Sequence, residues 1–383
     1  MTRRLVIITE IISPYRIPLF NELAQRRDVD LHVIFLAETD PGLRQWTVYK
    51  NEINFSYQVL RSWRKQIGRF HWLLNSGLGR ALKSSRPDVI VCGGYNYLAS
   101  WQALLWARIH STPFFLWSES NAQDLRSGHA LLELLKTEFL SQCMGYVVPG
   151  RSAAEYLRSR GIRQQRIFTA VNAVDNERFH ADAESVRCDA ARLRNDLGLP
   201  ARYFLFTGRL VREKGVFELL AAYAKLEGHL REQVGLVFVG DGAAREALEE
   251  ESRAITPGMI KFTGFIQREQ LAAYYALADV FILPTYTDTW GLVVNEAMTC
   301  GLPILLSRAA GCAADLVTED WNGHIVPSRS VTALASVMGT FASQPDLCAR
   351  MGANSRKRIL DYSPQQWCEG IVRMMASVGD GRG

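Results

Sequence analysis

The sequence predicts an α/β protein with two domains, each built on a parallel β-sheet covered by helices. Short apolar runs rich in Val and Ile alternate with longer segments of helical periodicity along the whole chain. These runs lack the polar alternation of half-exposed strands, which is typical of strands buried on both faces. The length of 383 residues exceeds one ordinary core and fits two domains of about 150–200 residues.

The first series of elements fills the first half of the chain. Residues 176–200 are polar and carry no strand pattern, so we place the linker near 174–180 and read 181–198 as helical or irregular. The series therefore predicts an N-terminal domain of residues 1–176. Strands are expected at 5–9, 31–35, 88–92, 114–117 and 145–148, and helices at 17–25, 73–83, 98–109 and 130–140.

The second series predicts a C-terminal domain of residues 177–364, followed by a final helix, 365–383, that packs back toward the first domain. Two Rossmann-like domains of this kind are expected to face each other across a cleft, with ligands where the carboxyl ends of the strands point. Strands are expected at 203–206, 235–239, 260–263, 280–283, 303–306 and 324–326, and helices at 215–227, 243–253, 268–277, 291–300, 330–342 and 345–360.

Cysteine usage and hydropathy favour a cytoplasmic protein. Seven cysteines occur without a CxxC pair, and several lie in apolar runs, which predicts buried reduced thiols. The apolar stretch near the N-terminus is too short for a signal peptide. The longest apolar region, 97–117, contains Gln102, Arg108 and His110 and is unsuited to span a bilayer. We expect a soluble or peripheral protein.

Charge is spread unevenly along the chain. Residues 1–180 contain 23 Lys and Arg against 15 Asp and Glu, whereas residues 181–383 contain 21 against 24. The basic half is expected to meet an anionic partner such as an anionic membrane surface, with a merely solvated surface as the alternative. Segment 61–72 interleaves cations with Trp63, Phe70 and Trp72 and is either a membrane or acceptor loop or a solvated loop. No groove-reading motif occurs, so nucleic acid is not expected.

Several ligand classes are disfavoured by missing motifs. The turn after the first strand, residues 9–15, has no glycine, which argues against a nicotinamide site, and no P-loop occurs. The histidines form no HxxxH or HxH pair, so no zinc site is expected. Asp28 and Asp30 have the form of a metal-binding DxD motif but lie far in sequence from the phosphate motifs, and we expect no metal.

Residues 207–215 form the first segment with chemical content. Gly208 and Arg209 follow a strand, and Lys214 and Gly215 open a helix. An Arg fork and a Lys point charge between two glycines suit a dianionic phosphate group. A basic surface loop is the alternative, and it explains Arg212 better than it explains the glycines.

Two further segments also join a strand to a helix. Gly240-Asp241-Gly242 is by itself weak and is compatible with a turn in which Asp241 caps a helix. The stronger one is 283–303, where a polar loop with Asp288 precedes a helix that begins near Gly291. The first-turn amides of that helix form an anion site favoured by the helix dipole. Glu296 lies inside the mostly apolar helix and needs a partner, either a ribose diol or a buried Arg.

In order and spacing these motifs resemble the GT-B retaining glycosyltransferases of family 4. The resemblance rests on Gly208-Arg209…Lys214-Gly215, Gly240-Asp241-Gly242, Phe262–Ile266, and Gly291-Leu292…Glu296-Ala297-Met298…Gly301-Leu302-Pro303. It covers about residues 168–365, and more loosely the whole chain.

The resemblance implies roles for these residues. Arg209 and Lys214 would hold the donor diphosphate, and Glu296 would bind the ribose. Asp288 and the amides of Trp290, Gly291 and Leu292 would hold the transferred sugar. The backbone of Phe265 and Ile266 would meet the base, beside Gly208 and Gly240.

The chain departs from the family pattern at four places, one of which is the missing Gly-Gly of the first loop. Asp288 stands where Glu is usual, and Trp290 where Phe is usual. Glu119 stands near the place of a His in many members and either takes its role near the reacting centre or caps a turn. Ser13 and Arg16, in the first loop, are expected on the acceptor side.

The resulting expectation is a glycosyltransferase that needs no metal or cofactor. It would move a sugar from a nucleoside diphosphate sugar to a hydroxyl of a saccharide or lipid-linked acceptor, with retention, in glycan biosynthesis. Two alternatives remain, a nucleotide-sugar epimerase of the same fold and a non-catalytic subunit. The pattern at 288–303 argues against the first, and the presence of Arg209, Lys214 and Glu296 against the second.

Overall fold

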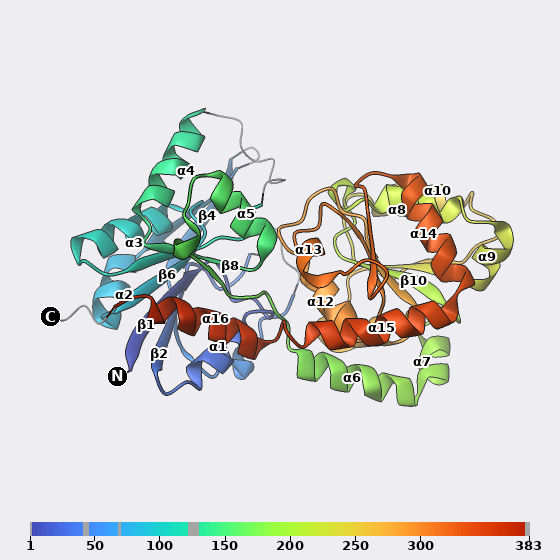
Figure 1. Cartoon of the computed structure of the whole chain (residues 1–383), viewed down its shortest axis with the longest axis horizontal. Helices are drawn as coiled ribbons and strands as arrows, with labels where there is room; N and C mark the ends of the chain where they lie inside the picture. Colours follow the sequence, from blue (N-terminus) through green and yellow to red (C-terminus); the bar gives the residue numbers. More distant parts are fainter. Residues whose placement is uncertain (1, 41–45, 68–69, 122–129, 380–383) are drawn as a thin grey trace. The chain divides into compact units, whose positions relative to one another are not determined.

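The computed structural model describes residues 2–40, 46–67, 70–121 and 130–379, without the side chains of 65–67, 70–72 and 130–132. The chain divides into two compact units (Figure 1). Unit 1 comprises Met1–Val174 and Pro364–Gly383, and unit 2 comprises Asp175–Ser363.

Unit 1 contains a seven-stranded sheet in the order β3-β2-β1-β6-β7-β8-β9, in which every neighbouring pair is parallel. In its centre, Leu5 of β1 lies between Leu31 of β2 and Val89 of β6, and all three side chains are buried. The strands are β1 (Arg3–Thr9), β2 (Val29–Phe35), β3 (Ser56–Val59), β6 (Val89–Gly93), β7 (Phe114–Trp117), β8 (Gly145–Val148) and β9 (Ile167–Thr169).

Helices cover both faces of this sheet. The apolar side chains of α1 and α16 form one core cluster with one face, and those of α2, α3, α4 and α5 form a second cluster with the other. The chain returns to unit 1 through α16, where an added Cβ on Gly370 would meet the carbonyl oxygen of Thr169 at 2.4 Å. The helices are α1 (Ile17–Ala24), α2 (Leu78–Ser85), α3 (Leu98–Ile109), α4 (Ala130–Gln142), α5 (Arg151–Ser159) and α16 (Pro364–Ala376).

Unit 2 contains a six-stranded parallel sheet in the order β12-β11-β10-β13-β14-β15. The first strand in sequence lies at the centre, and the order reverses beside it, as in doubly wound nucleotide-binding sheets. The strands are β10 (Tyr203–Thr207), β11 (Gly235–Val239), β12 (Ile260–Phe262), β13 (Val280–Leu283), β14 (Ile304–Ser307) and β15 (Gly323–Val326).

The helices of unit 2 pack on this sheet and on one another. Helix α6 packs on α11 and α12, α15 packs on α12, and α14 packs on α8. The helices are α6 (Asn176–Cys188), α7 (Ala190–Asp196), α8 (Val216–Ala224), α9 (Gly228–Gln233), α10 (Arg245–Ser252), α11 (Arg268–Ala276), α12 (Leu292–Thr299), α13 (Ala313–Leu316), α14 (Val331–Ser343) and α15 (Pro345–Ile359).

The predicted fold class is confirmed, because both units are parallel sheets covered by helices. Three local predictions are wrong. Most of the linker expected near 174–180 is helical, because α6 begins at Asn176, with the Asp175 side chain accepting from the Arg178 amide. Residues 73–76 belong to a strand, and the helix expected at 73–83 begins only at Leu78, after Gly77 in a left-handed conformation (φ 88°). Segment 61–72 is not a plain loop, because β4 (Arg61–Ile67) and β5 (Phe70–Ser76) pair there as an antiparallel hairpin. Among the described residues, no helix has the length and apolarity to cross a bilayer.

Candidate functional site

The loops that follow β10, β11 and β12 of unit 2 lie side by side at the carboxyl ends of these strands. Gly208 donates its amide to the carbonyl of Val239, and Leu210 donates to that of Asp241, both at 2.9 Å. Gly240 in turn donates to the carbonyl of Gly264 at 2.9 Å. The sheet order therefore brings segments that are far apart in the sequence to one edge.

The loop after β13 joins the same edge through Gly215. This glycine has φ 69°, and an added Cβ would lie 2.1 Å from the carbonyl oxygen of Pro284, so no larger residue fits there. The carbonyl of Glu213 accepts from the amide of Tyr286 at 2.8 Å and from the hydroxyl of Thr285 at 3.0 Å. Residues 207–215 and 284–291 thus form one connected surface.

The cations of this surface have different surroundings. Lys214 forms an ion pair with Asp288, with 2.5 Å between Nζ and Oδ2, and both side chains are mostly buried. Arg209 is exposed, and no described residue pairs with its guanidinium. Arg212 lies over the ring of Phe217 at 4.9 Å. Arg209 can therefore meet an anion directly, Lys214 is held by Asp288, and Arg212 packs on Phe217 of the following helix α8.

Asp288 also contacts the backbone that leads into α12. Its Oδ1 accepts from the amide of Trp290 at 3.3 Å. Helix α12 begins at Leu292 after Gly291, which has φ 97°, and no side chain caps it. Uncapped first-turn amides and the helix dipole favour an anionic or polyhydroxyl ligand here.

The substitution of Trp for the usual Phe at 290 has a local explanation. Trp290 is 2% exposed, and its indole N–H donates to Oδ1 of Asn295 at 2.9 Å. A buried indole requires such an acceptor. Asn295 is a partner that the sequence reasoning missed.

Glu296 is fully buried, and its Oε2 accepts from the hydroxyl of Tyr275 at 2.6 Å. The sequence suggests a ribose diol or a buried Arg as the partner of Glu296. The partner found in the structure, the hydroxyl of Tyr275, is neither of these. In the sequence, Tyr275 is one residue of the predicted helix 268–277, and no local pattern connects it to Glu296.

The remaining donor-side residues lie on the edge of β11 and β12. The interpretation of Asp241 as a helix cap is wrong, because α10 begins at Arg245 with Ala244 in the capping position. Instead, the Asp241 carboxylate accepts from the amide of Gly242 at 2.7 Å and pairs with Arg245 at 3.5 Å. Phe265 is 42% exposed, and Ile266 beside it is half-buried.

Unit 1 has its own polar cluster at the carboxyl ends of its strands. Arg16 pairs with Glu119 at 3.1 Å and lies over the ring of Trp117 at 4.0 Å. Asn172, which is 6% exposed, donates to the same carboxylate at 3.5 Å. Ser13 is half-buried at the turn that leads to Arg16, and its carbonyl accepts from the Arg16 amide at 3.0 Å. Ser13, Arg16 and Glu119 are therefore neighbours, and Asn172 is an addition.

A second cluster in unit 1 was not anticipated. Arg64 pairs with Asp40 at 2.6 Å and with Glu10 at 3.6 Å, so this cation is directed into the domain. Burial, followed by the nearby Glu10, raises the pKa of Tyr97 well above its usual value. Trp63 is 56% exposed, whereas the side chains of Lys65, Phe70 and Trp72 lie outside the described part of the chain.

The DxD motif is divided between two ion pairs. Asp28 pairs with Arg26 at 3.0 Å, and this hydrogen bond lowers the pKa of the carboxyl group. Asp30 pairs with Arg4. In the described residues, the His and carboxylate group with metal-ligand spacing consists of Glu319 and Asp320, which precede β15, and His324, which lies in it. It lies outside the loops that carry Arg209 and Asp288.

Two family models match the chain. The model for glycosyl transferases group 1 matches residues 190–358, and the model for glycosyltransferase family 4 matches residues 19–178. Together they match most of both units, whereas β1 and α16 lie outside the matched residues.

Curated relatives match part of the chain. A D-inositol 3-phosphate glycosyltransferase of Xylanimonas cellulosilytica is 31% identical over 58% of this chain and 53% of its own length. A GDP-mannose-dependent alpha-mannosyltransferase of Corynebacterium glutamicum is 36% identical over 49% of this chain and 41% of its own length. The chain thus spans about half the length of the curated relatives it matches.

Solved structures match over nearly the whole chain. The Anabaena protein Alr3699/HepE in complex with UDP superposes with a TM-score of 0.76 and 18% identity, covering 98% of this chain and 100% of the other. This likeness concerns the fold, which is GT-B. The two family models, which together match residues 19–178 and 190–358, show that the chain belongs to the group 1, family 4 glycosyltransferases.

Proposed function

We propose that this chain transfers a sugar from a nucleoside diphosphate sugar to a hydroxyl of a saccharide or lipid-linked acceptor, with retention of the anomeric configuration. The observation that carries the proposal is the connected surface of unit 2. It combines the exposed Arg209, the Lys214–Asp288 pair at 2.5 Å and the uncapped start of α12.

Charge development in the leaving group explains why such a surface would accelerate the reaction. As the bond between the anomeric carbon and the phosphate oxygen breaks, negative charge grows on the diphosphate. Arg209 and Lys214 would stabilise that charge, together with the amides at the start of α12. Fixed donors of this kind contribute roughly 2.7–4 kcal/mol each in comparable sites.

Asp288 would have two functions in this surface. It holds Lys214 and the Trp290 amide in the unliganded molecule. With donor bound, Lys214 would turn to the phosphate, and the carboxylate would accept a hydroxyl of the transferred sugar. The ion pair thus keeps the lysine pre-oriented.

Retention would follow from attack on the face that the leaving group vacates. In that step the acceptor oxygen bonds to the anomeric carbon, and the departing phosphate oxygen takes the acceptor proton. The double-displacement alternative needs a carboxylate beneath the sugar. NMR of the product anomer decides the stereochemistry, because an inverted product contradicts the proposal.

The donor is tested separately from the chemistry. Thermal shift with UDP-, GDP- and ADP-sugars identifies the base and sugar that bind. The bound donor is then incubated with saccharide and lipid-linked acceptors, and released nucleoside diphosphate is measured. Epimerised donor without any acceptor product would instead identify the epimerase.

We propose a cytoplasmic location, with peripheral attachment to the inner face of the membrane when the acceptor is lipid-linked. The basic composition of residues 1–180 supports this proposal. Arg64 would not contact the membrane lipids, because its guanidinium pairs with Asp40 and Glu10.

A further inference from the structure

Helix α3 carries an apolar stripe on its outward face. Leu98, Leu105 and Ile109 are 55%, 60% and 70% exposed, and their spacing places them along one side of the helix, with the exposed Gln102 between Leu98 and Leu105. The opposite side, with Ala99, Ala103 and Ala107, is buried on the sheet. Single exposed apolar residues are ordinary, but a stripe of three along one helix marks an interaction surface.

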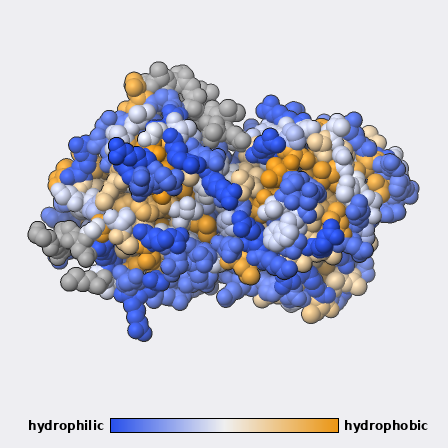
Figure 2. Space-filling view, in the orientation of Figure 1, coloured by the Kyte–Doolittle hydropathy of each residue, from blue (hydrophilic) through white to orange (hydrophobic). Residues whose placement is uncertain are grey.

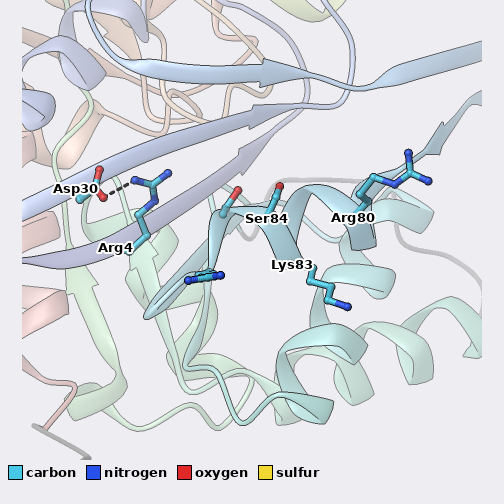
Figure 3. A pocket seen from close by; sticks show the side chains of 7 residues that line it. Arg4, Asp30, Arg80, Lys83 and Ser84 are labelled. Carbon is cyan, nitrogen blue, oxygen red and sulfur yellow. Dashed lines mark hydrogen bonds and ion pairs between the residues drawn. The ribbon is translucent and has the colours of Figure 1, made fainter.

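The neighbouring helix α2 has a cationic outward face. Arg80, Lys83 and Ser84 are exposed, and Arg86 follows in a left-handed conformation (φ 47°). They border a hollow of about 730 Å³ that also includes Arg4 and Asp30. Figure 3 shows Arg80, Lys83 and Ser84 projecting from one helix and Arg4 joined to Asp30. Among the described residues that line the hollow, the one carboxylate is Asp30, and it is paired with Arg4.

The two helices form one continuous face. They contact each other and pack on the same face of the sheet. Neither helix contains an acidic residue, and between them only Asp88 occurs, whose carboxylate accepts from the Arg4 amide at 2.8 Å.

Exposed apolar residues continue on α4. Leu134 and Leu135 are 67% and 44% exposed, and Phe139 of this helix packs edge-on against Trp101 of α3, with ring centroids 4.9 Å apart. Figure 2 shows hydrophobic residues at the surface over α3 and α4, among hydrophilic ones.

We propose that the outward face of α2 and α3 docks on an anionic lipid bilayer. Leu98, Leu105 and Ile109 would enter the interface, and Arg80, Lys83 and Arg86 would contact lipid phosphates. Helices with apolar residues beside cations and without acids are typical of interfacial helices. A nucleic acid would not use the apolar stripe. This inference rests on the proposed function, in which the bilayer presents the acceptor.

The docking face leaves uncovered the edge of unit 1 that is expected to bind the acceptor. Arg16 and Glu119 lie in loops at the carboxyl ends of β1 and β7, at the edge of the sheet. The docking face is formed by the helix layer on one side of that sheet. A bilayer-bound domain would therefore keep this edge open to an acceptor headgroup.

Co-sedimentation with vesicles tests the proposal. The vesicles contain phosphatidylcholine alone or mixed with phosphatidylglycerol, at low and high salt. The test variants are Arg80→Gln/Lys83→Gln and Leu105→Ser/Ile109→Ser. Leu360→Ser and Arg253→Gln are matched controls, because these side chains of unit 2 are 69% and 74% exposed.

Wild type is expected to bind the mixed vesicles, and less at high salt. Each lost cation should weaken binding about fivefold, which corresponds to about 1 kcal/mol. The apolar variant should weaken binding at both salt concentrations, and the controls should bind like wild type. Equal binding to both vesicle types, or unchanged binding by both test variants, overturns the docking face.

Two further arms separate the possible sources of failure. Calorimetry with inorganic phosphate distinguishes a free-anion site: phosphate binding that Arg80→Gln/Lys83→Gln abolishes, with vesicle binding unchanged, contradicts docking. Nucleotide release with a soluble acceptor should stay at the wild-type level in all variants. Loss of vesicle binding with normal release supports docking, whereas normal vesicle binding without any transferase activity contradicts only the proposed function.

Discussion

Lys214 and Asp288, which are 74 residues apart in the sequence, form an ion pair with 2.5 Å between Nζ and Oδ2. Both side chains are mostly buried, at 18% and 16% exposure, so water screens the pair less than an exposed one. The nearby Arg209 has no such partner among the described residues. The two cations of one proposed diphosphate site therefore differ in what they contribute to the fold.

This difference predicts unequal effects of two alanine substitutions. Arg209→Ala and Lys214→Ala should each lower turnover about a hundredfold or more, because each removes a donor to the leaving group. Only Lys214→Ala should also lower the free energy of unfolding, by roughly 1–2 kcal/mol, between the values for exposed and buried pairs. Steady-state kinetics and urea denaturation measure the two effects. Arg212→Ala is the control, and near-normal turnover in Arg209→Ala would remove the diphosphate role.

Tyr275→Phe is predicted to destabilise unit 2. The substitution removes the hydroxyl that donates to the buried Glu296 carboxylate at 2.6 Å, with almost no change in volume. A buried carboxyl oxygen that loses its hydrogen-bond donor costs about 1–3 kcal/mol. Tyr274→Phe, one residue earlier in the same helix, should cost less. Urea denaturation compares the two, and equal free energies of unfolding would show that this hydrogen bond contributes nothing.

The fold class was predictable because it depends on a short-range pattern. Leu98–Ile109 is a helix over the predicted range, and Phe114–Trp117 and Gly145–Val148 are strands over theirs. The hairpin of β4 and β5 was missed because its polar residues lack the apolar runs of buried strands, and β5 merges with the helical pattern that follows it.

The pairings within the candidate site were not predictable in the same way. Tyr275 and Glu296 lie on different helices, and Asn172 reaches Glu119 from another strand end. Nothing in the local pattern connects such residues, because the sheet order brings them together. Arg64 shows the opposite case, in which a cation in a basic aromatic segment is neutralised by Asp40 and Glu10.

Cys188 is expected to be the fast-reacting thiol of the folded protein. It is exposed, whereas the other six cysteines are buried. Burial raises the pKa of Cys92, Cys348 and Cys368 to about 12, so their reactive thiolates are scarce at neutral pH. Titration with Ellman's reagent should show one fast thiol in the native protein and seven in denaturant. A Cys188→Ser variant should lose the fast phase, and more than one fast native thiol would contradict the assignment.

The same burial predicts a loss of stability in alkali. A thiol whose pKa is about 12 when folded and near 9.0 when unfolded contributes its full stability below pH 9. That contribution falls as the pH rises from about 9 toward 12, because the unfolded state gains by ionising first. The free energy of unfolding, measured in urea between pH 8 and about 11, should stay level up to about pH 9 and decrease above it. A constant value would contradict the raised pKa values.

Activity is expected to survive EDTA. Arg209, Lys214 and the first amides of α12 would supply the positive charge that a metal ion supplies elsewhere. Asp28 and Asp30 are occupied by Arg26 and Arg4. The measurement is nucleotide release before and after chelation, with magnesium and manganese added back. Loss on chelation and recovery with either metal would overturn the prediction.

Glu119→Gln is expected to impair acceptor use while leaving donor binding intact. The carboxylate holds Arg16 at 3.1 Å and accepts from Asn172 at 3.5 Å, so it fixes the cation that lies over Trp117. Gln keeps the size and one acceptor oxygen but loses the charge. Arg16 should then be less well held, and the apparent acceptor KM should rise.

A double-mutant cycle with Arg16→Gln shows whether the two residues act together. If Glu119 acts through Arg16, the effects of the two substitutions on acceptor KM will be less than additive. Additive effects would separate the residues and give Glu119 a role of its own at the reacting centre. The thermal shift caused by donor should stay at the wild-type value in all three variants, since Arg16 and Glu119 lie in unit 1 and the proposed donor residues lie in unit 2. A lost donor shift would place Glu119 in donor binding and contradict the acceptor-side assignment.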